Sequence, residues 1–188
     1  MLLELQKSDL YRYYANTGFK TFLKAYFLIA GFRFMYWHRL ASWTSEKPLL
    51  RWLFLLSRFQ LSRYRFKLGI DMPWTTEVGP GFYIGHQGTI VVNGRSRIGR
   101  NCNISHGVTI GMIAYGKNAG SPQLGDRVYV GPGAKIIGNV VIGDDVAIGA
   151  NCVVTHDVPA GSVVVGIPAQ VISTNGSKGY ILNGWNGE

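Results

Sequence analysis

The sequence predicts a mainly β protein in which a parallel β-helix follows an N-terminal α-helical segment. From Val78 to Val154 an aliphatic residue returns at every sixth position over long stretches, commonly followed by Gly. An α-helix cannot keep a period of six on one face, because it repeats every ~3.6 residues, whereas a coil of short strands can. The residues before Asp71 lack this period and are basic and aromatic. We therefore expect two segments of different structure.

The first segment, residues 1–68, is expected to be helical. Residues 1–70 carry 12 Lys and Arg against 3 Asp and Glu, which equals the whole net charge of +9, and 17 of the 24 aromatic residues. Apolar side chains are dense in residues 19–43 and 49–70, and the SEKP stretch Ser45–Pro48 predicts a turn between two helices. Trp, Phe and Leu beside Lys and Arg are typical of helices that lie in a membrane surface.

Docking of this basic segment, which includes Lys20, Arg39 and Arg58, on a membrane surface is therefore favoured over simple packing on the rest of a trimer. An acidic capsule-type polymer would explain the same charge. The longest uncharged apolar run, Ala25–Phe32, is far shorter than the roughly 20 residues of a spanning helix. No signal-peptide pattern is present, and no recognised nucleic-acid-binding motif accompanies the basic residues. We expect a cytoplasmic protein, peripheral at the inner face of the cytoplasmic membrane, with no nucleic acid as partner.

The second segment, residues 69–173, is predicted to be a triangular prism. Each six-residue unit would form one side, with its aliphatic residue inside and Gly, Asn or Asp at the corner. Stacked coils then bury one continuous column, although a β-sandwich with coincidental spacing is the alternative. The repeat positions are Val78, Ile84, Ile98, Ile104, Ile110, Leu124, Val130, Ile136, Ile142, Ile148 and Val154.

A second apolar or small stripe follows four residues after these positions and strengthens the prediction. Its members are Cys102, Val108, Val128, Ala134, Val140, Val146 and Cys152. We expect the two cysteines to be packed thiols in a reducing cytoplasm.

Two interruptions of the repeat are expected to mark the binding face. The register slips by two residues between Ile84 and Ile98, and fourteen residues separate Ile110 from Leu124. Insertions in a solenoid form loops on one face, which is often the binding face. Residues 112–123 are predicted to be a protruding loop, and residues 174–188 a C-terminal tail.

The runs GVTIG and LGDRVYVGPGAKIIGNVVIGDDVAIGANCVVTHDVPAGSVVVGIPAQVI resemble the hexapeptide-repeat acyltransferases. The similarity covers about residues 68–173 and is closest to the serine acetyltransferase branch and its polysaccharide-modifying relatives of the colanic-acid type. The resemblance implies a left-handed parallel β-helix, acetyl-CoA as co-substrate, and a homotrimer with its sites between neighbouring prisms. It therefore predicts an acetyl-CoA-dependent O-acetyltransferase.

Two residues occupy the catalytic positions of that family. In serine acetyltransferases a histidine acts as general base, and an aspartate fifteen residues earlier orients it; His86 and Asp71 have this spacing. A neutral imidazole suits the task because its ordinary pKa is about 6.5, and a carboxylate on its second nitrogen fixes the tautomer. We expect His86 to be the base and Asp71 its orienting partner, the alternative being a surface histidine at a corner.

The groups that bind serine in the family are absent. The acidic residue before the histidine is Gly85, and the Arg-His pair before the Pro that follows the loop is Gly120-Ser121. The polysaccharide-modifying relatives resemble this chain in a second histidine, here His106. The predicted acceptor is therefore a sugar hydroxyl of a capsular or exopolysaccharide, a lipid-linked glycan or a nucleotide-sugar precursor. Serine O-acetylation in cysteine biosynthesis is one alternative, and a non-catalytic β-helix scaffold is another.

His106, Ser121 and Gln87 are expected to contact the acceptor. Acetyl-CoA would lie in a groove between two prisms, where small residues let its pantetheine arm pass and backbone N–H groups stabilise the oxyanion. The candidate residues for acetyl-CoA are Gly107, Gly111, Lys117, Gly131, Pro132, Gly133, Lys135 and Ala150.

Neither a metal nor a covalent intermediate is expected. Related β-helix carbonic anhydrases use three histidines, two of them five residues apart, but His86 and His106 stand alone and residue 111 is Gly. No Gly-x-Ser-x-Gly elbow or Cys–His arrangement is present. Direct transfer in a ternary complex is expected, with His156 on the surface and His38 packed or interfacial.

Overall fold

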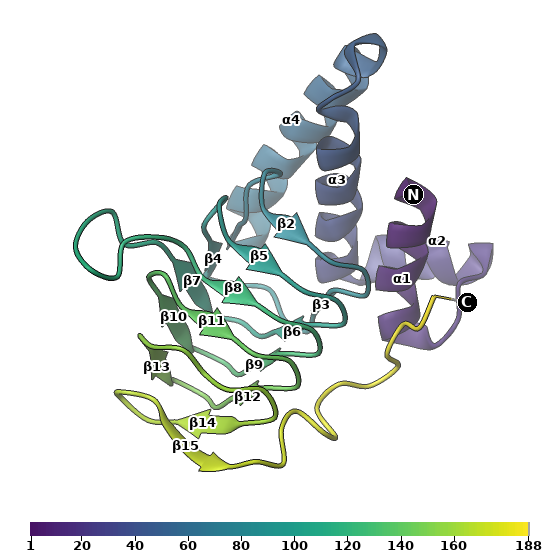
Figure 1. Ribbon diagram of the computed structural model, residues 1–188. Coiled ribbons are helices and arrows are strands. Elements are labelled where there is room, and N and C mark those ends of the chain that lie inside the picture. The colour runs from purple at the N-terminus through teal and green to yellow at the C-terminus, as the bar shows by residue number, and fades with distance from the viewer. Residues whose placement is uncertain (188) are drawn as a thin grey trace.

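The computed structural model describes residues 1–187 and shows a helical segment on top of a three-sided parallel β-helix (Figure 1). The helical elements are α1 (Leu2–Tyr14), α2 (Phe19–Leu28), α3 (Ala30–Thr44), the 3-10 turn η1 (Pro48–Leu50) and α4 (Arg51–Leu68). The predicted turn at Ser45–Pro48 joins α3 to η1. Helix α4 ends at Leu68 and is capped by Gly69, whose φ of 63° is a conformation that glycine adopts without a steric penalty. Residue 188, the last of the predicted tail, lies outside the described residues.

Each side of the prism is one sheet of short strands, and successive strands along the chain belong to different sides. Side A holds β1 (Ile70–Asp71), β4 (Ile90–Val92), β7 (Thr109–Gly111), β10 (Lys135–Ile137) and β13 (Val153–Val154). Side B holds β2 (Glu77–Val78), β5 (Arg97–Ile98), β8 (Gln123–Leu124) and β11 (Val141–Ile142). Side C holds β3 (Tyr83–Ile84), β6 (Asn103–Ile104), β9 (Tyr129–Val130), β12 (Ala147–Ile148), β14 (Val163–Val165) and β15 (Gln170–Ser173). The strands pair in parallel except β14 with β15, so the predicted fold class is confirmed.

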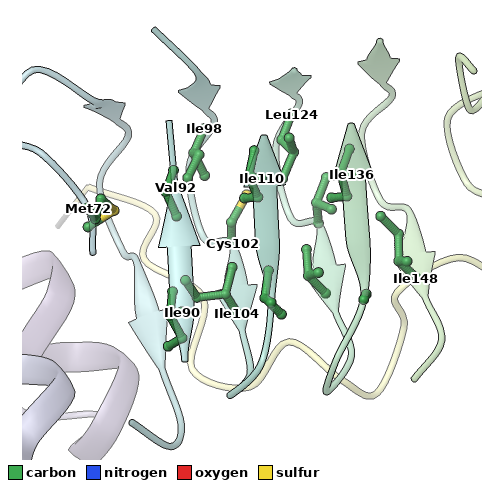
Figure 2. Close-up of a cluster of buried hydrophobic side chains, with 14 of the residues drawn as sticks. Met72, Ile90, Val92, Ile98, Cys102, Ile104, Ile110, Leu124, Ile136 and Ile148 are labelled. Carbon is green, nitrogen blue, oxygen red and sulfur yellow. The ribbon is translucent and has the colours of Figure 1, made fainter. Parts of the chain in front are cut away.

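The predicted aliphatic column fills the prism (Figure 2). Every repeat position except the half-buried Val78 is buried, and so are both cysteines. The structure adds Val92, which pairs with Ile110, and thereby locates the register slip: Val92 lies eight residues after Ile84 and six before Ile98. Burying an Ile or Val side chain contributes about 1.5–3 kcal/mol, so the column is the main source of stability.

The long interruption of the repeat forms a loop that leaves the prism between β7 and β8 (Figure 1). An antiparallel bridge between Ile113 and Gly120 closes it, with N···O distances of 3.0 and 2.9 Å. The Asn118 amide also donates to the Thr155 carbonyl at 3.0 Å. The loop is therefore tied to the β-helix rather than free in solvent.

Helices α1 and α3 pack on the first coil through a buried ion pair. The Arg39 guanidinium donates to both carboxylate oxygens of Asp9 at 3.0 Å, and the Phe82 N–H donates to Asp9 at 2.9 Å. Helix α3 comes so close to β3 that a Cβ on Gly31 would lie 2.5 Å from the Ile84 carbonyl oxygen. The expectation that Arg39 faces a membrane surface is wrong, because its side chain is only 4% exposed. Within residues 1–187 no helix combines the length and hydropathy of a transmembrane segment.

The C-terminal tail returns along side C to α1, so the two ends of the chain meet (Figure 1). Asn101 exchanges two hydrogen bonds with the backbone of Trp185, at 3.0 and 2.8 Å. The indole of Trp185 packs edge-on against Tyr11 of α1, with 5.5 Å between the ring centroids. The tail thus connects the β-helix to the helical segment.

Removal of one interior side chain should lower stability strongly. Ile136 is fully buried between Ile110 and Val154, and Ile136→Ala should lower the free energy of unfolding by about 2–5 kcal/mol. Val141 is 51% exposed on β11, so Val141→Ala should cost less than about 1 kcal/mol. Urea unfolding followed by circular dichroism measures both, and equal losses would contradict the interior column.

His38 should make stability depend on pH. It is packed as expected, with Nε2 3.0 Å from the Pro73 carbonyl oxygen, and burial lowers its pKa to about 3. Because an unfolded histidine titrates near pH ~6.5, the unfolded chain binds a proton that the folded chain rejects between these values. The His38 contribution is therefore complete above about pH 6.5 and is lost as the pH falls toward 3.

Between pH 7 and 5 the wild-type free energy of unfolding should fall by about 2 kcal/mol more than that of His38→Gln. Glutamine retains an N–H that can donate to Pro73 but does not titrate. Denaturation curves at a series of pH values measure the difference, and parallel pH profiles would exclude a buried neutral imidazole.

Candidate functional site

The corner between sides C and A gathers most of the residues selected from the sequence. His86 lies there between β3 and β4, and His106 lies one coil further between β6 and β7. Both side chains are exposed, and their rings meet edge to face with centroids 6.0 Å apart. His86 lies in the eight-residue step from Ile84 to Val92. The two additional residues lengthen this corner, and Gly88 and Thr89 complete it with φ values of 115° and 49°. We call this corner of stacked coils the histidine corner.

The candidate residues for acetyl-CoA divide between two places. Gly107, Gly131, Pro132, Gly133 and Ala150 stack on the histidine corner. Coil-to-coil hydrogen bonds hold this stack: Gly107 N–H donates to the Gly88 carbonyl, and Gly133 N–H to the His106 carbonyl, both at 2.9 Å. Neighbouring coils leave little space between them, since a Cβ on Gly107 would lie 3.2 Å from the Gly133 Cα.

Lys135 joins this group, because its ammonium donates to the Gly107 carbonyl. The others lie away from the corner: Gly111 ends β7 and Lys117 is exposed in the loop. Ser121 also lies apart, and its hydroxyl donates to the Asn93 amide oxygen at 3.1 Å. Of the acceptor candidates, Gln87 is exposed next to His86. The histidine corner therefore contains both predicted histidines and most of the predicted acetyl-CoA residues.

His86 lines a cavity of about 360 Å³ whose walls come from three parts of the chain. The β-helix contributes His86 and neighbouring polar groups, α1 contributes Arg12 and Tyr13, and the tail contributes Leu182 and its neighbours. The Tyr13 hydroxyl donates to the Ile84 carbonyl and accepts from the Ile84 N–H, both at 3.1 Å. Burial holds the pKa of Tyr13 well above its usual value, so this phenol is not an acid or base near neutral pH.

Asp71 lies outside this cavity. Its carboxylate forms an ion pair with Arg65 at 2.7 Å, and it lines a separate cavity of about 260 Å³. Within residues 1–187 no hydrogen bond joins it to His86. Register explains the separation, because Asp71 pairs with Val91, five residues beyond His86. The orienting role of Asp71 stays a prediction.

Arg12 is a cavity residue that sequence reasoning did not select. It is 3% exposed, and it donates to the Leu182 carbonyl at 2.9 Å, to the Asn103 amide oxygen at 2.6 Å and to the Gly81 carbonyl. No motif or spacing connects it to His86, which lies 74 positions later. Only its position among the apolar residues of an expected helix distinguishes it in the sequence.

The described part of the chain contains neither a cluster of metal-ligating side chains nor an exposed cysteine. Across residues 1–187 no three or more His, Cys, Asp or Glu side chains gather as a metal site would require. Both cysteines lie inside the prism, where burial raises the pKa of Cys102 to about 12 and also raises that of Cys152. Neither thiol is available as a nucleophile.

Comparison with known proteins identifies relatives of this chain. The profile of the bacterial transferase hexapeptide family (six repeats) matches residues 121–156. The serine acetyltransferase of Mycobacterium tuberculosis is 37% identical over 152 residues, which cover 81% of this chain and 65% of that protein. The serine acetyltransferase of Bacillus licheniformis is 31% identical over 159 residues, which cover 85% of this chain and 72% of that protein. The chain thus spans slightly less than two thirds of the first relative.

Solved structures agree. A Neisseria gonorrhoeae serine acetyltransferase in complex with serine has a TM-score of 0.76 and 28% identity, over 92% of this chain and 69% of that chain. A Brucella abortus serine acetyltransferase in complex with coenzyme A has a TM-score of 0.74 and 28% identity, over 92% of this chain and 66% of that chain. The likeness includes the helical segment as well as the β-helix.

These relatives overturn the glycan acceptor predicted from the sequence, and with it the assignment to polysaccharide biosynthesis. That prediction depended on the groups missing at Gly85, Gly120 and Ser121. The comparisons instead extend over most of the chain. The absence of side chains at those three positions was therefore not sufficient ground for a glycan acceptor.

The buried thiols should be unreactive in the folded protein. With 5,5′-dithiobis(2-nitrobenzoate) at pH 8, the native chain should release almost no thionitrobenzoate, because thiolate is the reactive form. In guanidinium chloride both cysteines of the sequence should react. Absorbance at 412 nm follows the reaction, and rapid labelling of the native chain would contradict the burial.

Proposed function

Because this chain belongs to the serine acetyltransferase family of hexapeptide-repeat transferases, we propose that it transfers an acetyl group from acetyl-CoA to the side-chain hydroxyl of L-serine. The products are O-acetylserine and free coenzyme A. The observation that carries the proposal is the exposed imidazole of His86, which belongs to the histidine corner where the acetyl-CoA candidates stack and also lines a cavity beside that corner. That combination suits a base acting between a small acceptor in the cavity and a donor that lies along the corner.

In the proposed reaction His86 removes the proton from the serine hydroxyl as its oxygen attacks the thioester carbonyl. The tetrahedral intermediate then collapses and expels the coenzyme A thiolate, which takes the proton from the imidazolium. Backbone N–H groups at the glycines of the histidine corner are proposed to stabilise the oxyanion. Asp71 is proposed to orient the imidazole, which requires its carboxylate to exchange Arg65 for His86.

Acetyl-CoA is proposed to lie along the histidine corner, over Gly107, Gly131, Gly133 and Ala150, with Lys135 beside it. The Brucella abortus relative binds coenzyme A, and the stacked small residues here would leave room for a pantetheine arm. A homotrimer is proposed as well, because the histidines are exposed on one prism and a neighbouring prism would complete the groove.

The N-terminal helices are proposed to build this site rather than to dock on a membrane, a role for which the comparisons give no support. Arg12 and Arg39 are buried against the β-helix, and α1 lines the His86 cavity. A cytoplasmic location stays a prediction.

His86→Ala tests the proposal directly. With L-serine and acetyl-CoA, release of coenzyme A should fall about 10²–10⁴-fold in this variant, which is the range supplied by general base catalysis. His156→Ala is the matched control, because His156 is an exposed histidine that follows β13 at the corner between sides A and B, away from the histidine corner, and this variant should keep wild-type turnover. Circular dichroism confirms that both variants fold.

The proposal fails if the wild-type chain does not use L-serine, or if His86→Ala keeps wild-type turnover.

A further inference from the structure

The buried guanidinium of Arg12 lines the His86 cavity and forms no ion pair with a carboxylate of the described residues. Arg12 and Arg39 are both buried near one buried carboxylate, that of Asp9. Arg39 occupies both oxygens of Asp9, which also accepts from the Phe82 N–H. None of the ion pairs formed within residues 1–187 includes Arg12. The two guanidiniums and one carboxylate leave one uncompensated positive charge.

The hydrogen bonds of Arg12 do not neutralise this charge. A guanidinium has five N–H donors, and three of those of Arg12 reach neutral oxygens, on Leu182, Gly81 and Asn103. Burial lowers the pKa of Arg12, but a guanidinium remains protonated at neutral pH. An unpaired buried charge is unfavourable unless a counter-ion arrives. The cavity therefore has a positive wall and spare donors that suit a small anion.

The volume of the cavity and the presence of His86 in its lining indicate which kind of anion fits. A volume of about 360 Å³ suits a small metabolite. His86 lines the same cavity, so a molecule held by Arg12 can present a hydroxyl to the imidazole. The planar fork of a guanidinium matches a carboxylate through two parallel hydrogen bonds.

We infer that Arg12 binds the α-carboxylate of L-serine, an inference that rests on the proposed function. It accounts for the absence of the family's Arg-His pair at Gly120 and Ser121, because α1 supplies a cation from the other side of the site. The C-terminal tail sets the guanidinium in place through the Leu182 carbonyl. The ring of Tyr180 stacks on Tyr129 at 4.4 Å and fixes this part of the tail on side C.

The competing explanation is that Arg12 only fastens the tail to α1 and side C. Comparison of L-serine with L-serinamide separates the two explanations, because the amide retains the hydroxyl and the ammonium but lacks the carboxylate. The experiment measures kcat/KM for both acceptors, by coenzyme A release, in the wild type, Arg12→Lys and Arg12→Gln. Asn101→Gly is the matched control, since it removes two hydrogen bonds to the tail at Trp185 and glycine tolerates the φ of 57°.

The wild type should prefer L-serine over L-serinamide by about 100-fold, the effect expected for charge-assisted hydrogen bonds to a carboxylate. Arg12→Gln should lose most of this preference through a higher KM for L-serine, with little change for L-serinamide. Arg12→Lys should keep part of it. Asn101→Gly should keep all of it even if both rates fall.

The inference is overturned if Arg12→Gln and Arg12→Lys retain the full preference, or if Asn101→Gly loses it equally. If the Arg12 variants do not fold, equal use of both acceptors by the wild type overturns it as well. Failure of the wild type to acetylate either compound would instead reject the proposed function itself. Turnover of L-serine without discrimination rejects only the role of Arg12.

Discussion

The stacking of corresponding corners in successive coils governs the rest of the structure. A six-residue step returns one aliphatic side chain to the interior on each side, so successive coils add strands to the same three parallel sheets. Residues at the same place in neighbouring coils therefore lie one above the other. His86, His106 and Gly133 share one corner for this reason, and backbone hydrogen bonds join the coils there. The packing that stabilises the prism also arranges the candidate site.

The β-helix alone does not enclose the site, and the two ends of the chain complete it. Helix α1 contributes Arg12 and Tyr13, while the tail closes over side C. Both ends are held by buried polar contacts, of which the Asp9–Arg39 pair fixes α1 to α3 and the first coil. Because the Asp9 carboxylate forms its ion pair with Arg39, the Arg12 guanidinium remains an unpaired cation in the cavity that His86 lines. A structural requirement thus generates an electrostatic feature that suits a carboxylate.

Periodicity predicted most of the fold, because an interior position recurs at every sixth residue. Periodicity did not locate β4, because Val92 lies eight rather than six residues after Ile84, and only its pairing with Ile110 shows that it is an interior position. The histidines followed from their positions in the repeat, whereas Arg12 lies in a helix that carries no register with the prism. Asp71 matched by spacing alone, which does not reveal its ion pair with Arg65. The acceptor was predicted wrongly because the prediction relied on the groups missing at Gly85, Gly120 and Ser121. The sequence also does not reveal which residues α1 contacts in the fold.

A crystal structure of the protein with L-serine and coenzyme A bound would show directly whether the cavity and the histidine corner hold the two substrates. We expect L-serine in the cavity of about 360 Å³, with its hydroxyl at His86 and its carboxylate at Arg12, and coenzyme A along the histidine corner. Serine bound beside the loop at Ser121, or coenzyme A on another corner, would contradict this expectation.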